Sequence, residues 1–296
     1  SKKKIIKGGF FMTRRRFPVG KTLLYVFMSL WALTTIYPFI WVILNSFKPR
    51  GLIRSDTFSL PIGDKFTLEN YVTAFKRVDI GTAYVNSIVI SGAVTVVVMV
   101  LAGLAAYAMV RYSFRLRGFL HSMIIASMMF PVFSTIIPVF RMESSWGIVN
   151  TGSIWLTRLS VVLPQIAGNL SFAIIVLMGF IRSLPVDLEE AAYLEGYNVY
   201  QIFFRIIMPL AKPSFATVGI FTFLWSYNDL FLQMFFLRSK KFFTITRLLN
   251  EISSQAGTNY GLMVAAVVMV VIPVLVVYIF LQNYIIKGMT AGAVKG

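Results

Sequence analysis

The chain has 296 residues, of which 57% are hydrophobic and only 13% are charged, and its formal net charge is +17. A soluble globular domain carries about 25% charged residues, so this composition excludes that class and indicates one integral membrane domain. Cysteine is absent, which excludes a disulfide framework and cysteine-based catalysis or metal binding.

The basic residues are spread along the chain. They are divided among loops that are separated by apolar runs, so no single face collects them into a groove for nucleic acid. Anionic lipid headgroups are the simpler partner for such a pattern. We therefore expect contact with membrane lipid and no binding of nucleic acid.

Residues 1–21 form a basic tail that is rich in Lys and Arg. A signal peptide also begins with basic residues, but the apolar run that follows here is too long and has no small-residue cleavage site. We interpret residues 1–21 as a cytoplasmic tail in front of an uncleaved first span.

Six runs of the chain are free, or nearly free, of charge and long enough to cross a membrane. A helix needs about 20 apolar residues to cross a bilayer core of about 30 Å. Residues 22–286 therefore form one all-α integral membrane domain, and residues 287–296 form a second cytoplasmic tail, because an even number of spans puts both ends on one side. The expected spans are residues 22–47, 82–110, 119–140, 159–181, 213–237 and 261–286.

The positions of Lys and Arg indicate the orientation, because these residues are enriched on the cytoplasmic side. With the N-terminus inside, the inner segments hold 16 of the 28 basic residues. The Lys and Arg residues are most closely spaced in the basic tail and in the short loop at residues 111–119. The loop at residues 183–212 then faces the cytoplasm.

Two outer loops are long, at residues 48–79 and 238–260. Each loop is compatible with a surface that a partner protein contacts and with a solvated linker. The sequence leaves both interpretations open.

Polar and helix-breaking residues interrupt the second, third and fourth spans. Proline in a membrane helix frees a backbone carbonyl and kinks the helix, which suits a gate but also occurs in spans without a gating role. The candidates for the pathway or gate in these spans are Asn86, Pro131, Pro138 and Asn169.

The loop at residues 183–212 carries the signals of two short helices. Pro185 suits the first turn of a helix, where its missing N–H needs no partner. Three acidic side chains follow where they favour the positive end of the helix dipole. Gly196 is able to adopt the left-handed conformation that ends a helix. The acidic residues are Asp187, Glu189 and Glu190.

A second helix is predicted directly after this turn. Asn198 suits its N-cap, and Pro209 is expected to stop it. Between them, apolar residues recur at helical spacing. These residues are Val199, Ile202, Phe203 and Ile206.

The motif Glu190-Ala191-Ala192, three residues, Gly196, nine residues, Ile206-x-Met208-Pro209 resembles the EAA loop of ABC importer permease subunits, which usually have Leu where Met208 stands. The resemblance implies that the two helices dock in a groove of a cytoplasmic ATPase, with Glu190 pairing with a basic group there. An amphipathic surface hairpin is the alternative. The residues implied in this coupling are Glu190, Ala191, Ala192, Gly196, Phe203, Ile206 and Pro209.

The fifth span contains the polar sequence Trp225-Ser226-Tyr227-Asn228-Asp229. An acid inside a span is costly and usually faces a partner or a wet cavity. Aromatic rings, an amide and a carboxylate suit a carbohydrate pathway, and equally an interfacial aromatic belt with one snorkelling acid. The candidate pathway residues here are Trp225, Tyr227, Asn228 and Asp229.

The chain ends in Thr290-Ala291-Gly292-Ala293-Val294-Lys295-Gly296. Taken alone, this is a frayed basic tail. It also resembles the terminus of sugar permeases of the maltose-importer type, and together with the EAA loop this resemblance covers nearly all of residues 20–296. It implies the carbohydrate branch of the type I importers, a MetI-like six-span fold, and a tail that reaches the ATPase through Thr290, Ala291, Gly292 and Lys295.

What the resemblance implies is the membrane subunit of a binding-protein-dependent importer of sugars, with oligosaccharides expected. The implied partners are a cytoplasmic ABC ATPase dimer, a second homologous permease subunit and an extracytoplasmic solute-binding protein. The implied location is the cytoplasmic membrane of a bacterium or archaeon, and the implied mechanism is alternating access.

No Gly-x-x-x-x-Gly-Lys-Ser/Thr phosphate loop occurs in the chain. We therefore expect ATP and Mg²⁺ to be bound by the partner ATPase, and no cofactor in this chain. A zinc signature and a Gly-x-Ser-x-Gly nucleophile elbow are also absent, so we expect no catalytic residue and no metal site, and no enzymatic activity of the chain itself.

Two other functions remain open. An ion-gradient-driven secondary transporter or channel needs coupling carboxylates near the midplane, and Asp229 is the only acid inside an expected span. A membrane scaffold without substrate would leave the polar fifth span without purpose.

Overall fold

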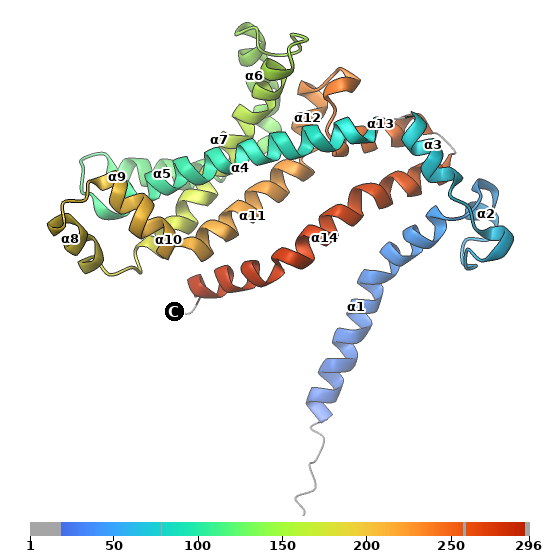
Figure 1. Cartoon of the computed structure of the whole chain (residues 1–296), viewed down its shortest axis with the longest axis horizontal. Coiled ribbons are helices and arrows are strands. Elements are labelled where there is room, and N and C mark those ends of the chain that lie inside the picture. The colour runs from blue at the N-terminus through green and yellow to red at the C-terminus, as the bar shows by residue number, and fades with distance from the viewer. Residues whose placement is uncertain (1–18, 78, 257–258, 294–296) are drawn as a thin grey trace, which may run out of the picture.

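The computed structural model describes residues 19–77, 79–256 and 259–293, and every regular element in these three stretches is a helix (Figure 1). This confirms the predicted all-α class; most of the predicted basic tail lies outside the described residues. Five helices are long: α1 (Val19–Ser46), α4 (Ile80–Arg111), α7 (Ile154–Ile181), α11 (Lys212–Asn228) and α14 (Tyr260–Ala293). The shorter elements are α2 (Arg50–Ser55), η1 (Gly63–Lys65), α3 (Glu69–Arg77), α5 (Arg117–Ser127), α6 (Val132–Ser145), α8 (Asp187–Leu194), α9 (Val199–Ile202), the π-helical η2 (Phe203–Ile207), α10 (Met208–Leu210), α12 (Phe231–Phe236), η3 (Lys240–Phe242) and α13 (Ile245–Ala256).

Four of the described helices are long and apolar enough to cross a membrane on their own: α1, α4, α7 and α14. Two bent pairs are apolar enough to make one further crossing each, namely α5 with α6, and residues 199–210 with α11. The described residues therefore offer four crossings, or up to six if each bent pair is one span.

Two segments expected as single spans are each divided between two helices. α5 and α6 meet at an angle of 104° beside Pro131, which has no N–H to donate to the preceding turn. Near the end of the fifth segment, α11 gives way to α12 because the Asp229 carboxylate accepts a hydrogen bond from the Leu232 N–H at 3.2 Å. That bond caps the first turn of α12.

α4 is the central helix of the packed core and lies against both α7 and α11. Its innermost face repeats every four residues through Val94, Val98, Ala102 and Ala106, all of which are completely buried. Small side chains at this spacing let neighbouring backbones approach closely, which is how membrane helices gain van der Waals contact. By contrast, α1 lies apart from the bundle in Figure 1 and packs on α14.

A hydrogen bond between helices compensates for the proline in α14. Pro273 has no N–H, so the carbonyl of Met269, four residues earlier, has no partner within the helix. The Tyr84 hydroxyl of α4 donates a hydrogen bond to this carbonyl. An unpaired carbonyl in an apolar surrounding is costly, so the bond stabilises the contact between α4 and α14.

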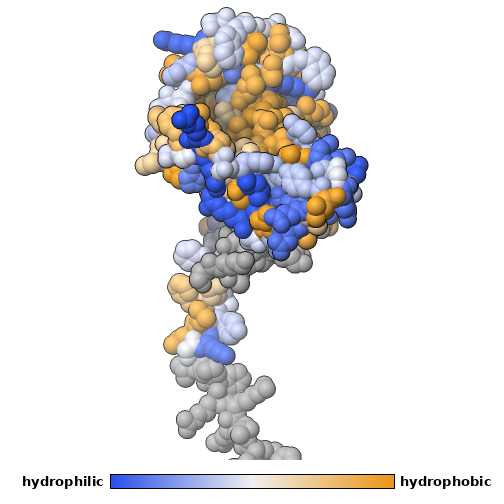
Figure 2. Space-filling model, turned by 90° about the vertical axis from the view of Figure 1, so that its left-hand side faces the viewer, coloured by the Kyte–Doolittle hydropathy of each residue, from blue (hydrophilic) through white to orange (hydrophobic). Residues whose placement is uncertain are grey.

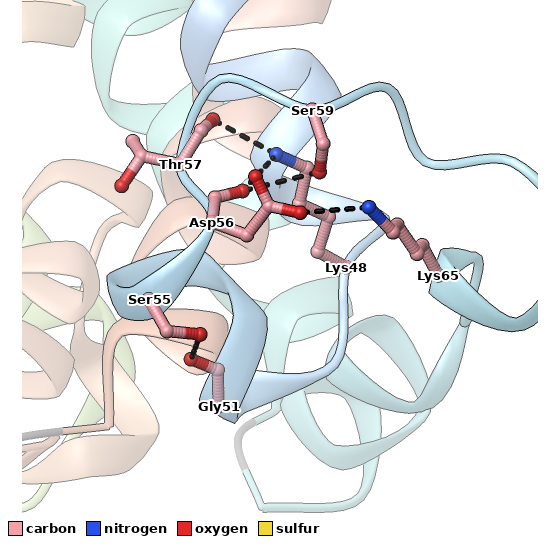
Figure 3. A network of polar contacts seen from close by, with 7 residues as sticks. All are labelled: Lys48, Gly51, Ser55, Asp56, Thr57, Ser59 and Lys65. Carbon is pink, nitrogen blue, oxygen red and sulfur yellow. Dashed lines mark hydrogen bonds and ion pairs between the residues drawn. The ribbon is translucent and has the colours of Figure 1, made fainter.

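The outer segment at residues 48–79 is packed on the ends of the long helices. Lys48 is completely buried, and its Nζ donates hydrogen bonds to the carbonyl oxygens of Asp56 at 3.0 Å and Thr57 at 2.8 Å (Figure 3). The Asn70 amide donates to the carbonyls of Ser46 and Lys48. Burial lowers the pKa of Lys48, and the nearby Asp56 carboxylate opposes that shift. Of the two interpretations, this packing does not fit a free linker.

Replacing Lys48 by methionine is expected to loosen the outer segment locally. The change leaves the partly buried carbonyls of Asp56 and Thr57 without their charged donor, which costs about 1–3 kcal/mol. Hydrogen exchange of the amides at residues 50–60 should therefore become about tenfold faster or more, since 1.4 kcal/mol is a factor of ten. The matched control is Lys65→Met, which removes only a half-exposed ion pair with Asp56. Equal exchange rates in both variants would contradict the stated role of Lys48.

Candidate functional site

The loop at residues 183–212 lies at the end of the molecule opposite to α2, α3 and α13 (Figure 1). It contains α8, α9, η2 and α10, and residues 199–210 meet α11 at an angle of 82°. The loop, called the coupling loop below, is therefore a two-armed element attached to the start of a long helix.

A Schellman cap ends the first arm. Gly196 has a φ of +84°, and its N–H donates to the Tyr193 carbonyl at 3.0 Å, while the Tyr197 N–H donates to the Ala192 carbonyl at 3.0 Å. These are the two hydrogen bonds of that motif, so the predicted left-handed conformation of Gly196 is confirmed. The start of α8 lies later than predicted from Pro185, because the first carbonyl that accepts helical bonds is that of Val186.

The second arm begins at Asn198, as predicted. Its side chain accepts from the Gln201 N–H at 2.9 Å, and the Gln201 side chain accepts from the Asn198 N–H at 2.8 Å, which is a complete capping box. The helix then loosens into the π turn η2, in which the Met208 N–H donates to the Phe203 carbonyl. The helical path runs to Leu210, one residue past the predicted stop at Pro209.

Two adjacent glutamates in α8 lie on different faces of the helix. Glu190 is exposed, whereas Glu189 is 4% exposed. Both oxygens of the Glu189 carboxylate are held by α4: Oε1 accepts from Arg111 Nε at 2.5 Å, and Oε2 accepts from the Tyr107 hydroxyl at 2.7 Å. Arg111 also donates from Nη2 to the Leu184 carbonyl at 3.0 Å. The inner face of α8 is thus tied to the end of α4.

Phe203 inserts the second arm into the bundle. Its side chain is 1% exposed, and its ring centroid lies 5.6 Å from that of Tyr107 and 6.5 Å from that of Phe215. Gly103 makes room for it, since a Cβ at Gly103 would lie 2.8 Å from Cζ of Phe215 and 3.0 Å from Cζ of Phe203. Phe203 therefore packs on the membrane helices, whereas Ile206 is only partly buried.

The outer face of the coupling loop is open. Leu194, at the tip of α8, is 91% exposed. Between the two arms lies an open groove with a volume of about 420 Å³. Figure 2 views this end of the molecule and shows hydrophilic residues gathered below a region of apolar side chains. The groove is lined by Leu188, Ala191, Ala192, Glu195, Arg205, Ile206, Pro209 and Leu210.

Three of the predicted pathway residues are engaged inside the chain. Asn86 is 1% exposed, donates to the carbonyls of Lys241 and Phe243, and accepts from Arg158 Nη2 at 2.9 Å. It therefore fastens α4 to η3 and α7.

Asp229 and Asn169 both form hydrogen bonds with Gln165. The Gln165 side chain donates to Asp229 Oδ2 at 2.9 Å and accepts from the Ser226 hydroxyl at 2.6 Å. The Asn169 side chain donates to the Gln165 carbonyl at 2.7 Å. The acid of the fifth segment is thus stabilised by α7 rather than by a second charge.

The other predicted residues of the fifth segment differ in exposure. Trp225 is 47% exposed and its ring lies 4.8 Å from that of Phe172 and 5.8 Å from that of Phe221, centroid to centroid. Asn228 is exposed and donates to the Leu224 carbonyl, whereas Tyr227 is buried. Trp225 and Asn228 are therefore the two exposed residues of this set.

The remaining predicted residues lie in or next to α6 and at the end of α14. Pro131 precedes the first turn of α6, and Pro138 lies within that helix. Thr290, Ala291 and Gly292 lie in the last turns of α14, and Lys295 is outside the described residues. Among the described residues, no group of three or more His, Asp or Glu side chains is placed to hold a metal ion.

Five residues of this arrangement were missed by the sequence reasoning. Three of the five share one signal in the sequence. Gly103, Tyr107 and Arg111 recur at i, i+4 and i+8, which places them on one face of a helix. That pattern does not identify a partner. The five residues are Gly103, Tyr107, Arg111, Gln165 and Glu189.

Residues 99–291 match the family model described as "binding-protein-dependent transport system inner membrane component". The matched region begins within α4 and includes the whole coupling loop.

Relatives match almost the entire chain. The diacetylchitobiose uptake system permease protein NgcG of Streptomyces coelicolor is 33% identical over 92% of this chain and 88% of its own length. The melibiose/raffinose/stachyose import permease protein MelC of Bacillus subtilis is 31% identical over 88% of this chain and 91% of its own. A chain of a bacterial ABC transporter involved in the import of the acidic polysaccharide alginate has a similar fold, with a TM-score of 0.77, 24% identity, and coverage of 90% of this chain and 96% of that one.

Proposed function

The chain belongs to the family of inner membrane components of binding-protein-dependent transport systems, and from this we propose that it conducts oligosaccharides as one permease subunit of an ATP-driven importer. The family predicted from the EAA loop is thereby confirmed. The named relatives import diacetylchitobiose and melibiose, raffinose or stachyose, which supports short oligosaccharides as the substrate class.

The observation that carries the proposal is the two-sided construction of the coupling loop. Its inner face is fixed to α4 by Glu189 and Phe203, while its outer face presents Glu190, Leu194 and an open groove. The groove residues Leu188 and Leu210 are also exposed, and several apolar side chains exposed together favour burial against another protein. We assign that partner as a cytoplasmic ABC ATPase dimer, which binds ATP and Mg²⁺.

Each predicted coupling residue then has a place in the proposal. Glu190 pairs with a basic group of the ATPase, and Gly196 sets the angle between the arms. Phe203 and Ala192 hold the loop on the bundle. Ala191, Ile206 and Pro209 line the groove. The C-terminal residues Thr290, Ala291, Gly292 and Lys295 form a second contact with the ATPase.

The proposed pathway lies between this chain and a second, homologous permease subunit. Trp225 and Asn228 are the candidates for direct sugar contact, because they are exposed. Asn86, Asn169, Tyr227 and Asp229 stabilise the wall behind them, and the bend at Pro131 together with Pro138 contributes to the gate. An extracytoplasmic solute-binding protein delivers the sugar to the outer loops.

The proposed topology places both chain ends and the coupling loop in the cytoplasm. Residues 1–21 and 287–296 are the tails, and residues 22–286 form the permease domain of a cytoplasmic membrane. ATP binding closes the ATPase dimer, the coupling loop moves with it, and the cavity opens to the outside; hydrolysis resets it.

Purification of the tagged chain from its own membranes tests the proposal. We expect an ATPase, a second permease subunit and a solute-binding protein to accompany the chain. In proteoliposomes, the complex should take up diacetylchitobiose or raffinose only with ATP inside and the binding protein outside. A chain that purifies alone and moves sugar down or against an ion gradient without ATP would contradict the proposal.

Replacing Asp229 by asparagine is expected to leave ATP-driven uptake within about twofold of the wild type. The new amide oxygen still accepts the Leu232 N–H that caps α12. The Gln165 amide is able to turn over, so that its oxygen accepts from the new amide NH2 and its own NH2 donates to the Ser226 hydroxyl. Each neutral hydrogen bond contributes only about 1 kcal/mol. A transporter that couples an ion through this acid would lose uptake completely. The measurement is the initial rate of sugar uptake by proteoliposomes with ATP, compared with an imposed ion gradient.

A further inference from the structure

Both arms of the coupling loop contact one face of α4. Gly103, Tyr107 and Arg111 follow each other at intervals of four residues, so their side chains share one face of the helix. The Phe203 ring of the second arm lies against Gly103 and Tyr107, and the Glu189 carboxylate of the first arm binds Tyr107 and Arg111. Both arms therefore meet in the last three turns of α4.

Glu189 is the main anchor of α8. Of the side chains in α8, only Glu189 and Ala192 are buried. Ala192 offers a single methyl group, whereas Glu189 makes two charge-assisted hydrogen bonds to α4. The Arg111 guanidinium also holds the Leu184 carbonyl, just before α8, so the pair fixes both the helix and the segment that enters it.

The ion pair is well shielded from water. The side chains of Arg111 and Glu189 are 11% and 5% exposed, so solvent and salt screen their interaction little. A buried ion pair contributes little stability compared with an apolar contact, but its geometry is specific and its loss leaves an unpaired buried charge. Such a pair is suited to keeping α8 and α4 in one relative orientation while α8 is displaced.

We propose that Glu189 is a positioning residue that joins α8 to α4, so that the two helices move as one body when the ATPase displaces the coupling loop. The inference rests on the proposed function. The two neighbouring glutamates have different roles, because Glu190 engages the ATPase whereas Glu189 passes the displacement to α4 through Arg111 and Tyr107. α4 then carries it into the core, since it packs on α7 and α11.

The first experiment measures uptake per ATP hydrolysed by the complete complex in proteoliposomes. Glu189→Gln is expected to keep the complex assembled and hydrolysing ATP, while uptake per ATP falls at least tenfold. Glu190→Gln is the matched comparison one residue away: it should reduce the amount of ATPase that co-purifies, which Glu189→Gln should not do. A role in folding alone would lower the yield of Glu189→Gln complexes without changing their uptake per ATP, and that outcome overturns the proposal.

The second experiment measures movement. Because the chain has no cysteine, spin labels at Leu101→Cys on α4 and Asp187→Cys on α8 report the distance between the helices; both residues are exposed. With Glu189 in place, this distance should be the same in the nucleotide-free and ATP-bound complexes. In Glu189→Gln it should change between the two states. A constant distance in the variant overturns the proposal.

A charge-swapped chain covers the case in which Glu189→Gln does not assemble. Glu189→Arg combined with Arg111→Glu restores an ion pair, and it should recover uptake per ATP to within a few fold of the wild type, whereas Arg111→Glu alone should not. If the swapped chain assembles and stays uncoupled, the proposal fails. Failure of the wild-type complex to use ATP for uptake would instead refute the proposed function.

Discussion

Replacing Gly196 by valine is expected to reduce ATP-driven sugar uptake at least tenfold while the chain stays in the membrane. Gly196 has a φ of +84°, and the left-handed conformation costs an L-residue about 1–2 kcal/mol, with more for a β-branched side chain. No atom lies within 4 Å of a Cβ at this position. The cost is therefore one of backbone conformation and not of collision.

The valine variant should lose the fixed angle between the two arms of the coupling loop. Without the left-handed residue, the Schellman bonds from Gly196 and Tyr197 break, and α8 no longer stands at a fixed angle to α9. Retention of the ATPase during purification should fall together with uptake, because each 1.4 kcal/mol is a factor of ten in binding.

Gly196→Asn is the matched control. Asparagine adds a side chain of similar bulk but adopts the left-handed conformation more readily than most residues, so it should retain most of the ATPase and of the uptake. Equal activity of the valine and asparagine variants would show that the backbone conformation at this turn is not what the complex requires.

Replacing Gly103 by leucine is expected to cause the second large effect. The coupling loop should lose the site on α4 against which Phe203 packs. A Cβ there would already lie 2.8 Å from Phe215 and 3.0 Å from Phe203, and both rings are almost completely buried. Overpacking a core of this kind costs about 1–3 kcal/mol. The larger side chain should displace Phe203, so uptake per ATP should fall at least tenfold and the complex should melt at a lower temperature.

Gly92→Leu is the control on the same helix, because nothing lies within 4 Å of a Cβ at Gly92; it should leave melting and uptake near the wild type. A second comparison is Gly103→Ala alone and together with Phe215→Leu, because Phe215 contributes the two nearest atoms. If the clash causes the effect, the smaller leucine should restore part of the uptake per ATP and of the melting temperature. Residues in contact show such coupling in double-mutant cycles. Equal effects at Gly92 and Gly103 would instead point to a general intolerance of bulk in α4.

Local signals in the sequence determined the helices and the turn between the two arms. Apolar runs of spanning length specified the all-α class, since they depend only on composition along the chain. Gly196 and Asn198 specified the Schellman cap and the capping box, because both motifs form hydrogen bonds within a few residues. The order of the EAA motif was sufficient for the family.

Only the tertiary structure decided which of two adjacent glutamates faces inward. Glu189 and Glu190 are chemically identical, and the choice depends on Tyr107 and Arg111, which are 82 and 78 positions away along the chain. In the same way, Asp229 was predicted as a pathway residue, but its partner Gln165 lies 64 residues earlier. Hydrogen bonds between helices depend on how the bundle packs, and no periodicity within one segment contains that information.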